Sequence, residues 1–391
     1  MIPRWSQAAC LALLFVTACE SSYGSLTFPR TTRGSLTGVP GNALLPGKVG
    51  QLDPVSSSVP GETGLPAASW ARDVAALFDS PSGPILENAD GIWRISRGVK
   101  QLLADRLPPV HSRKAYAFTP DGKHGWAVGN GLYSWDATRS VWVGRATEQL
   151  VGRKLMDVSV HGDGEDYQVL AVGNRGTMLA CEGDDTSWKA LVHDDPGLQI
   201  GPDTEFTTIR WSKSGDAWVG GKDLWHVRHD AMERIPLPGA DVVGIRSVAP
   251  GSHGNVHAVL VNEARLPRGT RQWSGDTLAT WNGSGWTQTF LPARTGVGDP
   301  QIVQLATAGD LGLAIERGAP GGRLFRYTEQ SGWTILEDRL PEAYLDTLVF
   351  SDSHDVAYAL DISEQRVWRL DVPELRWTLL GERSETVQSL R

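Results

Sequence analysis

The chain lacks a concentration of positive charge. Its 37 Lys and Arg residues are outnumbered by 45 Asp and Glu residues, giving a net charge of -8 at pH 7 and a pI near 5.6. A nucleic-acid groove needs clustered Lys and Arg to replace the counterions of the phosphates. The composition therefore excludes nucleic acid as an expected partner.

Charged residues are scarce overall, and so are segments whose apolar residues recur with the 3.6-residue period of an amphipathic helix. At 21% charged and 40% hydrophobic residues, the chain is too apolar to remain a disordered polymer. Its 44 Gly and 23 Pro residues make turns frequent and long helices unexpected. The apolar run near the start, Ala8 to Val16, is too short to cross a bilayer, which needs about 20 residues.

That run, preceded by Arg4, has the form of a bacterial secretory signal. It ends in Val16-Thr17-Ala18-Cys19, which resembles the lipobox of bacterial lipoproteins. The resemblance implies cleavage after Ala18, lipidation of Cys19 and a partner that is the lipid bilayer itself, because several acyl chains anchor a protein stably. An ordinary signal peptide with a chance cysteine at its cleavage site is the alternative.

Two further expectations follow from the lipobox. Glu20 stands where Asp retains enterobacterial lipoproteins at the inner membrane, so the outer membrane of a Gram-negative envelope is favoured. Cleavage removes Cys10 and lipidation uses Cys19, so Cys181 is left alone and no internal disulfide is possible.

The chain divides into three parts. We expect a signal peptide at 1–18, a lipidated flexible linker at 19–68, rich in Ser, Thr, Gly and Pro, and a folded domain at 69–391. Within that domain an apolar residue that opens an alternating segment recurs every 40 to 54 residues: Ile92, Leu132, Met178, Leu224, Leu278, Leu324 and Val367. Four short period-2 segments per repeat and no 3.6-residue stripe predict an all-β fold, a seven-bladed β-propeller of four-stranded blades.

Aromatic residues recur in the same repeats. Trp142, Trp188, Trp286, Trp333 and Trp377 stand near the start of the fourth expected strand. A Trp fixed in each blade is expected to fill the wedge between neighbouring sheets. Cys181, three residues after its anchor, is interpreted as a small buried hydrophobe. The first blade is the least regular: 70–78 has helical spacing, but Phe78 to Ile85 matches a two-strand interval and predicts strands. The tail Glu385 to Leu390 could instead close the ring.

Three segments carry a family resemblance. Asp121–Leu132 (DGKHGWAVGNGL) is echoed by Leu170–Met178 (LAVGNRGTM) and Ala217–Leu224 (AWVGGKDL). They resemble the repeats of photosystem II assembly-factor and sialidase-type Asp-box propellers. The resemblance implies the propeller architecture and transfers no activity, because the Asp-box hairpin and the converging arginines, Tyr and acid of a sialidase are not matched residue by residue.

Residues with possible chemistry have simpler interpretations. His226 and His229 lie on opposite faces of an expected strand, which disfavours a shared metal. His193-Asp194-Asp195 could bind a divalent ion or form a polar loop, and 163–166 is interpreted as a turn. No phosphate-binding loop or nucleophile elbow appears. We therefore expect no catalytic residue, no metal site and no cofactor.

Loop lengths point to one face for recognition. First-to-second and third-to-fourth connections are short, whereas the second-to-third connection of blade five, 262–275, is long. With 192–204, 292–299 and 316–322 it would form a long-loop face. The predicted partner-binding residues there are Arg265, Arg268, Arg271, Trp273, Arg294 and Arg317. A flexible insertion whose Trp packs locally is the alternative.

These features predict a non-enzymatic envelope lipoprotein that serves as a binding or assembly scaffold for a protein or glycan partner. A propeller glycoside hydrolase or lyase acting on polysaccharide is the alternative.

Overall fold

The structure, a computed structural model, describes residues 74–80, 83–96, 99–107, 113–145, 150–164, 166–183, 187–191, 200–228, 231–265, 271–291, 301–317, 322–336, 340–351 and 353–380. All of them lie within one compact unit, Pro60–Arg391. They form 28 β-strands, and no α-helix occurs in these ranges. Accordingly, none of the described segments is a helix that could cross a membrane.

The strands form seven four-stranded antiparallel sheets, each built from four consecutive strands. Blades 1 and 2 contain β1 (Ala76–Phe78), β2 (Ile85–Asn88), β3 (Gly91–Ser96), β4 (Val99–Ala104), β5 (Arg113–Phe118), β6 (Gly125–Gly129), β7 (Leu132–Asp136) and β8 (Val141–Arg145). Blades 3 and 4 contain β9 (Leu155–Asp163), β10 (Asp166–Gly173), β11 (Met178–Glu182), β12 (Lys189–Ala190), β13 (Phe206–Trp211), β14 (Ala217–Gly221), β15 (Leu224–Arg228) and β16 (Ala231–Ile235). Blades 5 to 7 contain β17 (Val242–Pro250), β18 (Val256–Arg265), β19 (Arg271–Trp281), β20 (Trp286–Thr289), β21 (Gln301–Ala308), β22 (Leu311–Arg317), β23 (Leu324–Thr328), β24 (Gly332–Leu336), β25 (Leu345–Phe350), β26 (Val356–Asp361), β27 (Arg366–Asp371) and β28 (Arg376–Leu379).

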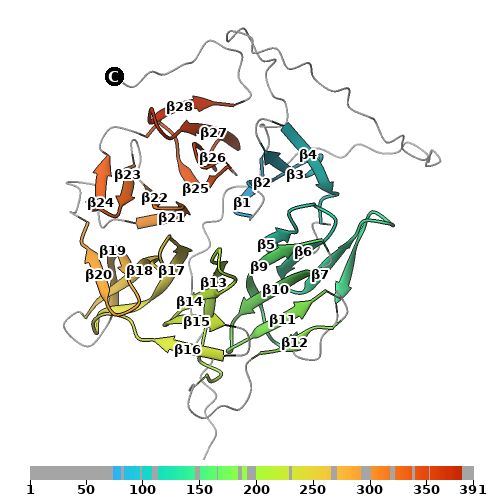
Figure 1. Cartoon of the computed structure of the whole chain (residues 1–391), viewed down its shortest axis with the longest axis horizontal. Coiled ribbons are helices and arrows are strands. Elements are labelled where there is room, and N and C mark those ends of the chain that lie inside the picture. Colours follow the sequence, from blue (N-terminus) through green and yellow to red (C-terminus); the bar gives the residue numbers. More distant parts are fainter. Residues whose placement is uncertain are drawn as a thin grey trace, which may run out of the picture. The chain divides into compact units, whose positions relative to one another are not determined.

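The seven sheets follow one another around a ring (Figure 1). The first strand of one blade contacts the first strand of the next along most of the ring, as β9 does with β5 and β13, so these strands line the centre. The predicted seven-bladed propeller is confirmed. Blade 1 is also confirmed as strands, with Phe78 opposite Ile85 in the β1–β2 pair.

The predicted anchors form the core. All seven lie in the third strand of their blades, and each is at most 1% exposed. The recurring Trp residues pack between blades as predicted: Trp333 of blade 6 belongs to a cluster with Val259 and Leu278 of blade 5. Trp142 and Trp286 are partly buried, and their indole N–H groups donate to the carbonyl oxygens of Asp105 and Pro236 at the end of the preceding blade, at 2.8 and 3.0 Å.

Cys181 behaves as expected for a small apolar side chain. It is 2% exposed and belongs to the core cluster shared by blades 2 and 3, together with Val169 and Trp188. Its position in that cluster confirms the interpretation of Cys181 as a packing residue.

The Val-Gly pairs of the repeated segments have a packing cause. A Cβ atom on Gly173 would lie 2.0 Å from the carbonyl oxygen of Lys154, and one on Gly221 would lie 2.0 Å from that of Glu205. In both blades the pairing of the first two strands shifts register at this point. Glycine is therefore needed where the first strand passes closest to the second.

Blades 7 and 1 close the ring by packing. The backbone N–H of Val74 donates to the carbonyl oxygen of Gln365 at 3.0 Å. Leu77 and Leu86 of blade 1 share a buried cluster with Val349 and Leu360 of blade 7. The tail 385–390, which the sequence offered as an alternative closure, lies outside the described residues.

One expectation about the connections is wrong. The connection 262–275 of blade 5 is not an open loop, because β18 and β19 continue through most of it. Glu263 pairs with Trp273 and Arg265 with Arg271 as a long hairpin extension. Continuing the ladder satisfies backbone N–H and C=O groups that an open loop would leave to solvent.

Candidate functional site: a central hollow

A hollow of about 1100 Å³ opens at the centre of the ring, on the face formed by the first-to-second turns. It receives residues from all seven blades, including Asp79, Pro120, His161, Trp211, Lys213, His253, Gly309 and His354. We call it the central hollow. Its volume is slightly above the usual range of ligand pockets, roughly 300 to 1000 Å³.

The short turns explain why the hollow is open. The first-to-second turns of blades 4 and 5 each close with a hydrogen bond between backbone groups four residues apart: Ser212 N to Asp216 O at 2.8 Å, and Gly251 N to Asn255 O at 2.8 Å. Such tight turns do not reach across the axis. They leave the inner strand ends uncovered and direct their side chains to the rim.

The charged groups of the lining balance. Asp79, Asp216 and Glu233 face Arg210, Lys213 and Arg228, three acids against three bases. A hollow with no excess of either sign gives no long-range attraction to a strongly charged ligand. Its lining is suited to an uncharged polar or zwitterionic one.

An ion cluster joins three blades on the inner wall. The Arg210 guanidinium lies 2.7 Å from the Asp157 carboxylate and 3.5 Å from that of Asp79. The same Asp157 oxygen accepts the backbone N–H of Ile209 at 3.0 Å. Asp157 therefore ties blade 3 to the inner strand of blade 4 and fixes the direction of Arg210.

The Asp79 carboxyl is unusual in this cluster. Burial among protein atoms raises its pKa above the ordinary value, nearby Arg210 opposes the rise, and Asp157 adds to it. Its side chain nevertheless keeps 38% of its surface exposed. Protein atoms therefore surround the carboxyl on most sides, which raises its pKa, while water reaches it from the hollow, which accounts for its exposed surface. Carboxyls of this kind are found at binding and catalytic sites.

Stacked aromatic pairs line the side of the hollow formed by blades 3 and 4. The rings of His161 and Trp211 stack with centroids 5.4 Å apart, and those of Trp218 and His226 stack at 3.9 Å. Burial lowers the pKa of His226, and Asp216, 3.3 Å from its Nε2, opposes that shift. The imidazole of His226 therefore favours its neutral form, which stacks without the cost of burying a charge.

Sequence patterns did not indicate this site. Loop lengths placed recognition on the opposite face, and the histidine motifs considered were close neighbours in the chain. A signal existed: His124, His253 and His354 each stand one to three residues before the second strand of a blade. Their recurrence at the same turn of different blades places them on one face of the ring.

The predicted partner-binding residues occupy the other strand ends. Arg265, Arg271 and Trp273 lie in β18 and β19 beside the second-to-third connection, and their side chains are outside the described part of the chain. Arg317, at the end of β22, forms an ion pair with Asp346 of blade 7. Because strand direction alternates in each blade, these positions face away from the first-to-second turns. The structure therefore does not bring them together with the central hollow.

Several predicted positions lie outside the described residues. These are Cys19, His193, Asp194, Asp195, His229, Arg268 and Arg294. The segment 163–166 is the tip of the β9–β10 hairpin, where Asp163 pairs with Asp166, which confirms the predicted turn.

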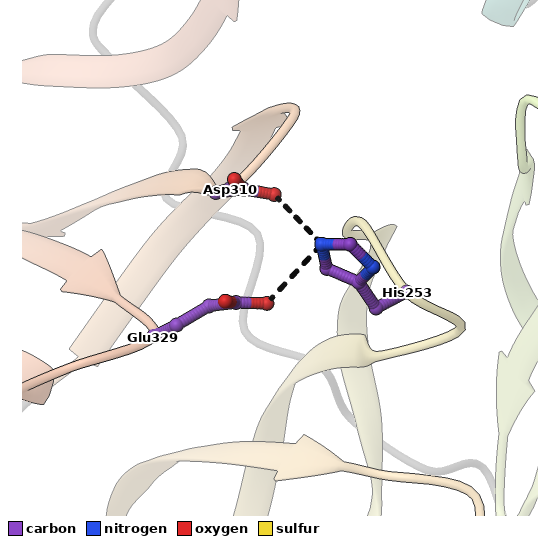
Figure 2. Close-up of side chains that lie close together, drawn as sticks. All are labelled: His253, Asp310 and Glu329. Atoms are coloured by element: carbon purple, nitrogen blue, oxygen red, sulfur yellow. Dashed lines mark ion pairs between the residues drawn. The ribbon is translucent and has the colours of Figure 1, made fainter.

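One group of potential metal ligands forms within the described ranges. It contains His253, Asp310 and Glu329, at the rim of the central hollow between blades 5 and 6 (Figure 2). None of the three was predicted from the sequence, because they come from separate turns of two blades.

No family model matches the chain, and no curated protein matches it. Among solved structures it is similar to a streptogramin B lyase, with a TM-score of 0.56 and 11% identity over 81% of this chain and 97% of that one. It is also similar to hydrazine synthase from Kuenenia stuttgartiensis, with a TM-score of 0.54 and 10% identity over 81% and 99%. A third similar structure is a catalytically inactive virginiamycin B lyase from Staphylococcus aureus with quinupristin. Its TM-score is 0.52, and the identity is 14% over 69% of this chain and 84% of that one. At these identities the similarity shows the propeller fold alone.

Proposed function

We propose that the chain is a lipid-anchored envelope protein that binds an uncharged polar ligand, a glycan or a loop of a partner protein, in the central hollow without catalysing a reaction. The observation that carries the proposal is the hollow itself, lined by side chains from all seven blades. Long-range convergence of polar and aromatic side chains on one concavity is typical of ligand sites.

The lining favours this class of ligand. The acids and bases of the hollow balance, which gives no basis for selecting an anion or a cation. Trp211 and Trp281 contribute partly exposed indole rings, and Ser159, Ser212 and Ser214 contribute hydroxyls. Flat apolar rings beside hydroxyl groups match the alternating C–H and O–H surfaces of a sugar.

The anchoring part of the proposal rests on the N-terminal pattern. Residues 16–19 have the lipobox form, and the segment that follows has a linker composition. A tether of this kind would hold the propeller near the membrane surface, with the outer membrane favoured by Glu20.

A blocking substitution tests the binding site. Ser214 is an exposed serine in the first-to-second turn of blade 4 and lines the hollow. Ser214→Trp should obstruct the hollow and lower binding to a panel of envelope glycans, or recovery of partner from solubilised envelope, by tenfold or more. The matched control is Ser331→Trp, an exposed turn serine of blade 6 that is not in the lining. Equal binding by both variants, with unchanged melting temperatures, would contradict the proposal.

A second candidate function, lysis or hydrolysis of a polysaccharide, is favoured by one observation. Burial raises the pKa of Asp79 above the ordinary value of a carboxyl, and Arg210 lies beside it, so the hollow contains a carboxyl that could act as a proton donor or acceptor. Turnover of any glycan in the same panel, abolished by Asp79→Asn, would make this the function. Binding without turnover leaves the non-enzymatic proposal in place.

A further inference from the structure

We propose that His253, Asp310 and Glu329 bind one divalent transition-metal ion, for which Zn²⁺ is the best-fitting choice, across the seam between blades 5 and 6. The proposal goes beyond the binding function of the central hollow and does not depend on it. An ion here would hold two blades together and leave a coordination position open at the rim.

The three side chains converge from three turns. His253 lies in the first-to-second turn of blade 5, Asp310 in that of blade 6 and Glu329 in the third-to-fourth turn of blade 6. The Nε2 atom of His253 is 3.8 Å from an Asp310 carboxylate oxygen and 3.7 Å from one of Glu329. Figure 2 shows both carboxylates directed at the same ring nitrogen.

These separations fit a metal ion. The donor atoms all lie within 4.8 Å of one another. Zn²⁺ sits about 2.0 to 2.2 Å from imidazole nitrogen and carboxylate oxygen, which places neighbouring ligand atoms about 3 to 4 Å apart. Small rotations of three exposed side chains are enough to complete the site.

The backbone holds the turns in place without an ion. The N–H of Ser252 donates to the carbonyl oxygen of Gly309 at 3.1 Å, a hydrogen bond between the blade 5 and blade 6 turns. It fixes the residues directly before His253 and Asp310. Glu329 follows β23, which pairs with β22 directly after Asp310. The ligands therefore come from neighbouring turns whose spacing the propeller sets.

The donor set selects the class of metal. One imidazole and two carboxylates suit Zn²⁺ and similar first-row ions, whereas Ca²⁺ and Mg²⁺ prefer all-oxygen sites. Two carboxylates this close repel each other unless a cation lies between them. The side chains keep 70%, 63% and 45% of their surfaces exposed, so solvent can reach the ion and supply its remaining ligands.

The competing explanation is that a protonated His253 forms ion pairs with the two carboxylates and no metal binds. Zn²⁺ itself is the probe that distinguishes the two. Isothermal titration of the full chain, purified in detergent without a histidine tag, should show one Zn²⁺ bound per chain. Bound Co²⁺ should give visible absorption bands, and Mg²⁺ should not compete.

Three conservative variants locate the site. His253→Gln, Asp310→Asn and Glu329→Gln should each weaken Zn²⁺ binding by tenfold or more, while metal-free melting temperatures stay close to that of the parent. His354→Gln is the matched control, because His354 is also exposed, lines the hollow and has a positive φ, 64° against 54° for His253. It should bind Zn²⁺ as the parent does.

Two results would overturn the assignment. The first is a parent chain that binds no Zn²⁺ at one-to-one stoichiometry, which would leave ion pairs only. The second is unchanged binding in the three variants, or an equal loss in His354→Gln, which would place the ion elsewhere.

Discussion

At the level of single residues, the recurring Trp side chains carry the packing between blades. Trp333 is 7% exposed, and its ring lies 5.4 Å from that of Tyr327 and 5.5 Å from that of His257. Its benzene edge also lies against Gly312, where an added Cβ atom would approach within 2.9 Å. This side chain is buried and closely surrounded, so we expect its loss to leave a cavity between the blades.

We therefore predict that Trp333→Ala lowers the free energy of unfolding by about 3 to 5 kcal/mol. Phe290, an apolar side chain that is 76% exposed, is the control, and Phe290→Ala should change stability by less than about 0.5 kcal/mol. Urea unfolding of both variants checks the difference. Equal midpoints would show that Trp333 is not a packing residue.

A second residue links stability to pH. Burial lowers the pKa of His257 from 6.5 to about 4, and the side chain is 2% exposed. Between these values the unfolded chain binds a proton that the folded chain does not. The contribution of His257 is therefore complete above pH 6.5 and is lost as the pH falls toward 4, by about 3 kcal/mol.

His257→Gln should remove this part of the pH dependence. The variant keeps a polar group near Thr280, whose hydroxyl lies 2.9 Å from Nδ1 of His257. Unfolding free energies measured from pH 7 to 4 should fall less steeply in the variant than in the parent. Parallel curves would mean that His257 titrates normally.

The residues that line the central hollow could not be predicted as a group from the sequence. His253 and His354 belong to turns about 100 residues apart, and both line the central hollow only because blades 5 and 7 surround one axis. Spacing rules such as His-x-x-His search for ligands within one element. They cannot detect a site assembled from equivalent turns of different blades.

At the level of elements, the sequence predicted the blades well. Each blade is a local unit with period-2 strands and tight turns, so its pattern is complete within about 45 residues. The connections were harder. In blade 5 the polar residues around Arg265 and Arg271 read as a loop, yet the two strands extend until these residues pair. Ladder hydrogen bonds depend on the backbone and leave little trace in side-chain patterning.

The register shift beside Gly173 provides an element-scale prediction. Gly173→Ala would place a methyl group 2.0 Å from the Lys154 carbonyl oxygen and 2.9 Å from the Leu155 Cα, both backbone atoms. Separating the inner two strands of blade 3 to relieve this should cost about 1 to 3 kcal/mol or more. Gly285→Ala, with open space around its position, should be nearly neutral. Similar melting temperatures for the two variants would contradict this account of the Val-Gly pair.

At the level of the whole molecule, attachment to the membrane remains a prediction from the first residues of the chain. Cys19→Ser should release the protein from membranes or leave it unprocessed, because the thiolate that receives lipid is gone. Labelling with a palmitate analogue, followed by fractionation of the envelope, checks this. Labelling that survives the substitution would exclude Cys19 as the attachment site.

The two faces of the ring are alternative binding sites for the partner. The long-loop face carries the residues predicted from sequence, with Trp273 as their aromatic member, and the opposite face carries the central hollow. Recognition on the long-loop face would place a binding hot spot at Trp273, whose truncation would cost about 2 kcal/mol or more of affinity. Recognition in the hollow would leave Trp273→Ala without effect on capture.

The most direct test is a side-by-side capture experiment with Ser214→Trp and Trp273→Ala, using ligand or partner recovered from native envelope and confirming that both variants melt like the parent. Binding in the central hollow predicts that Ser214→Trp loses capture by tenfold or more while Trp273→Ala retains it. Retained capture by Ser214→Trp together with loss in Trp273→Ala would contradict the account and move the site to the opposite face.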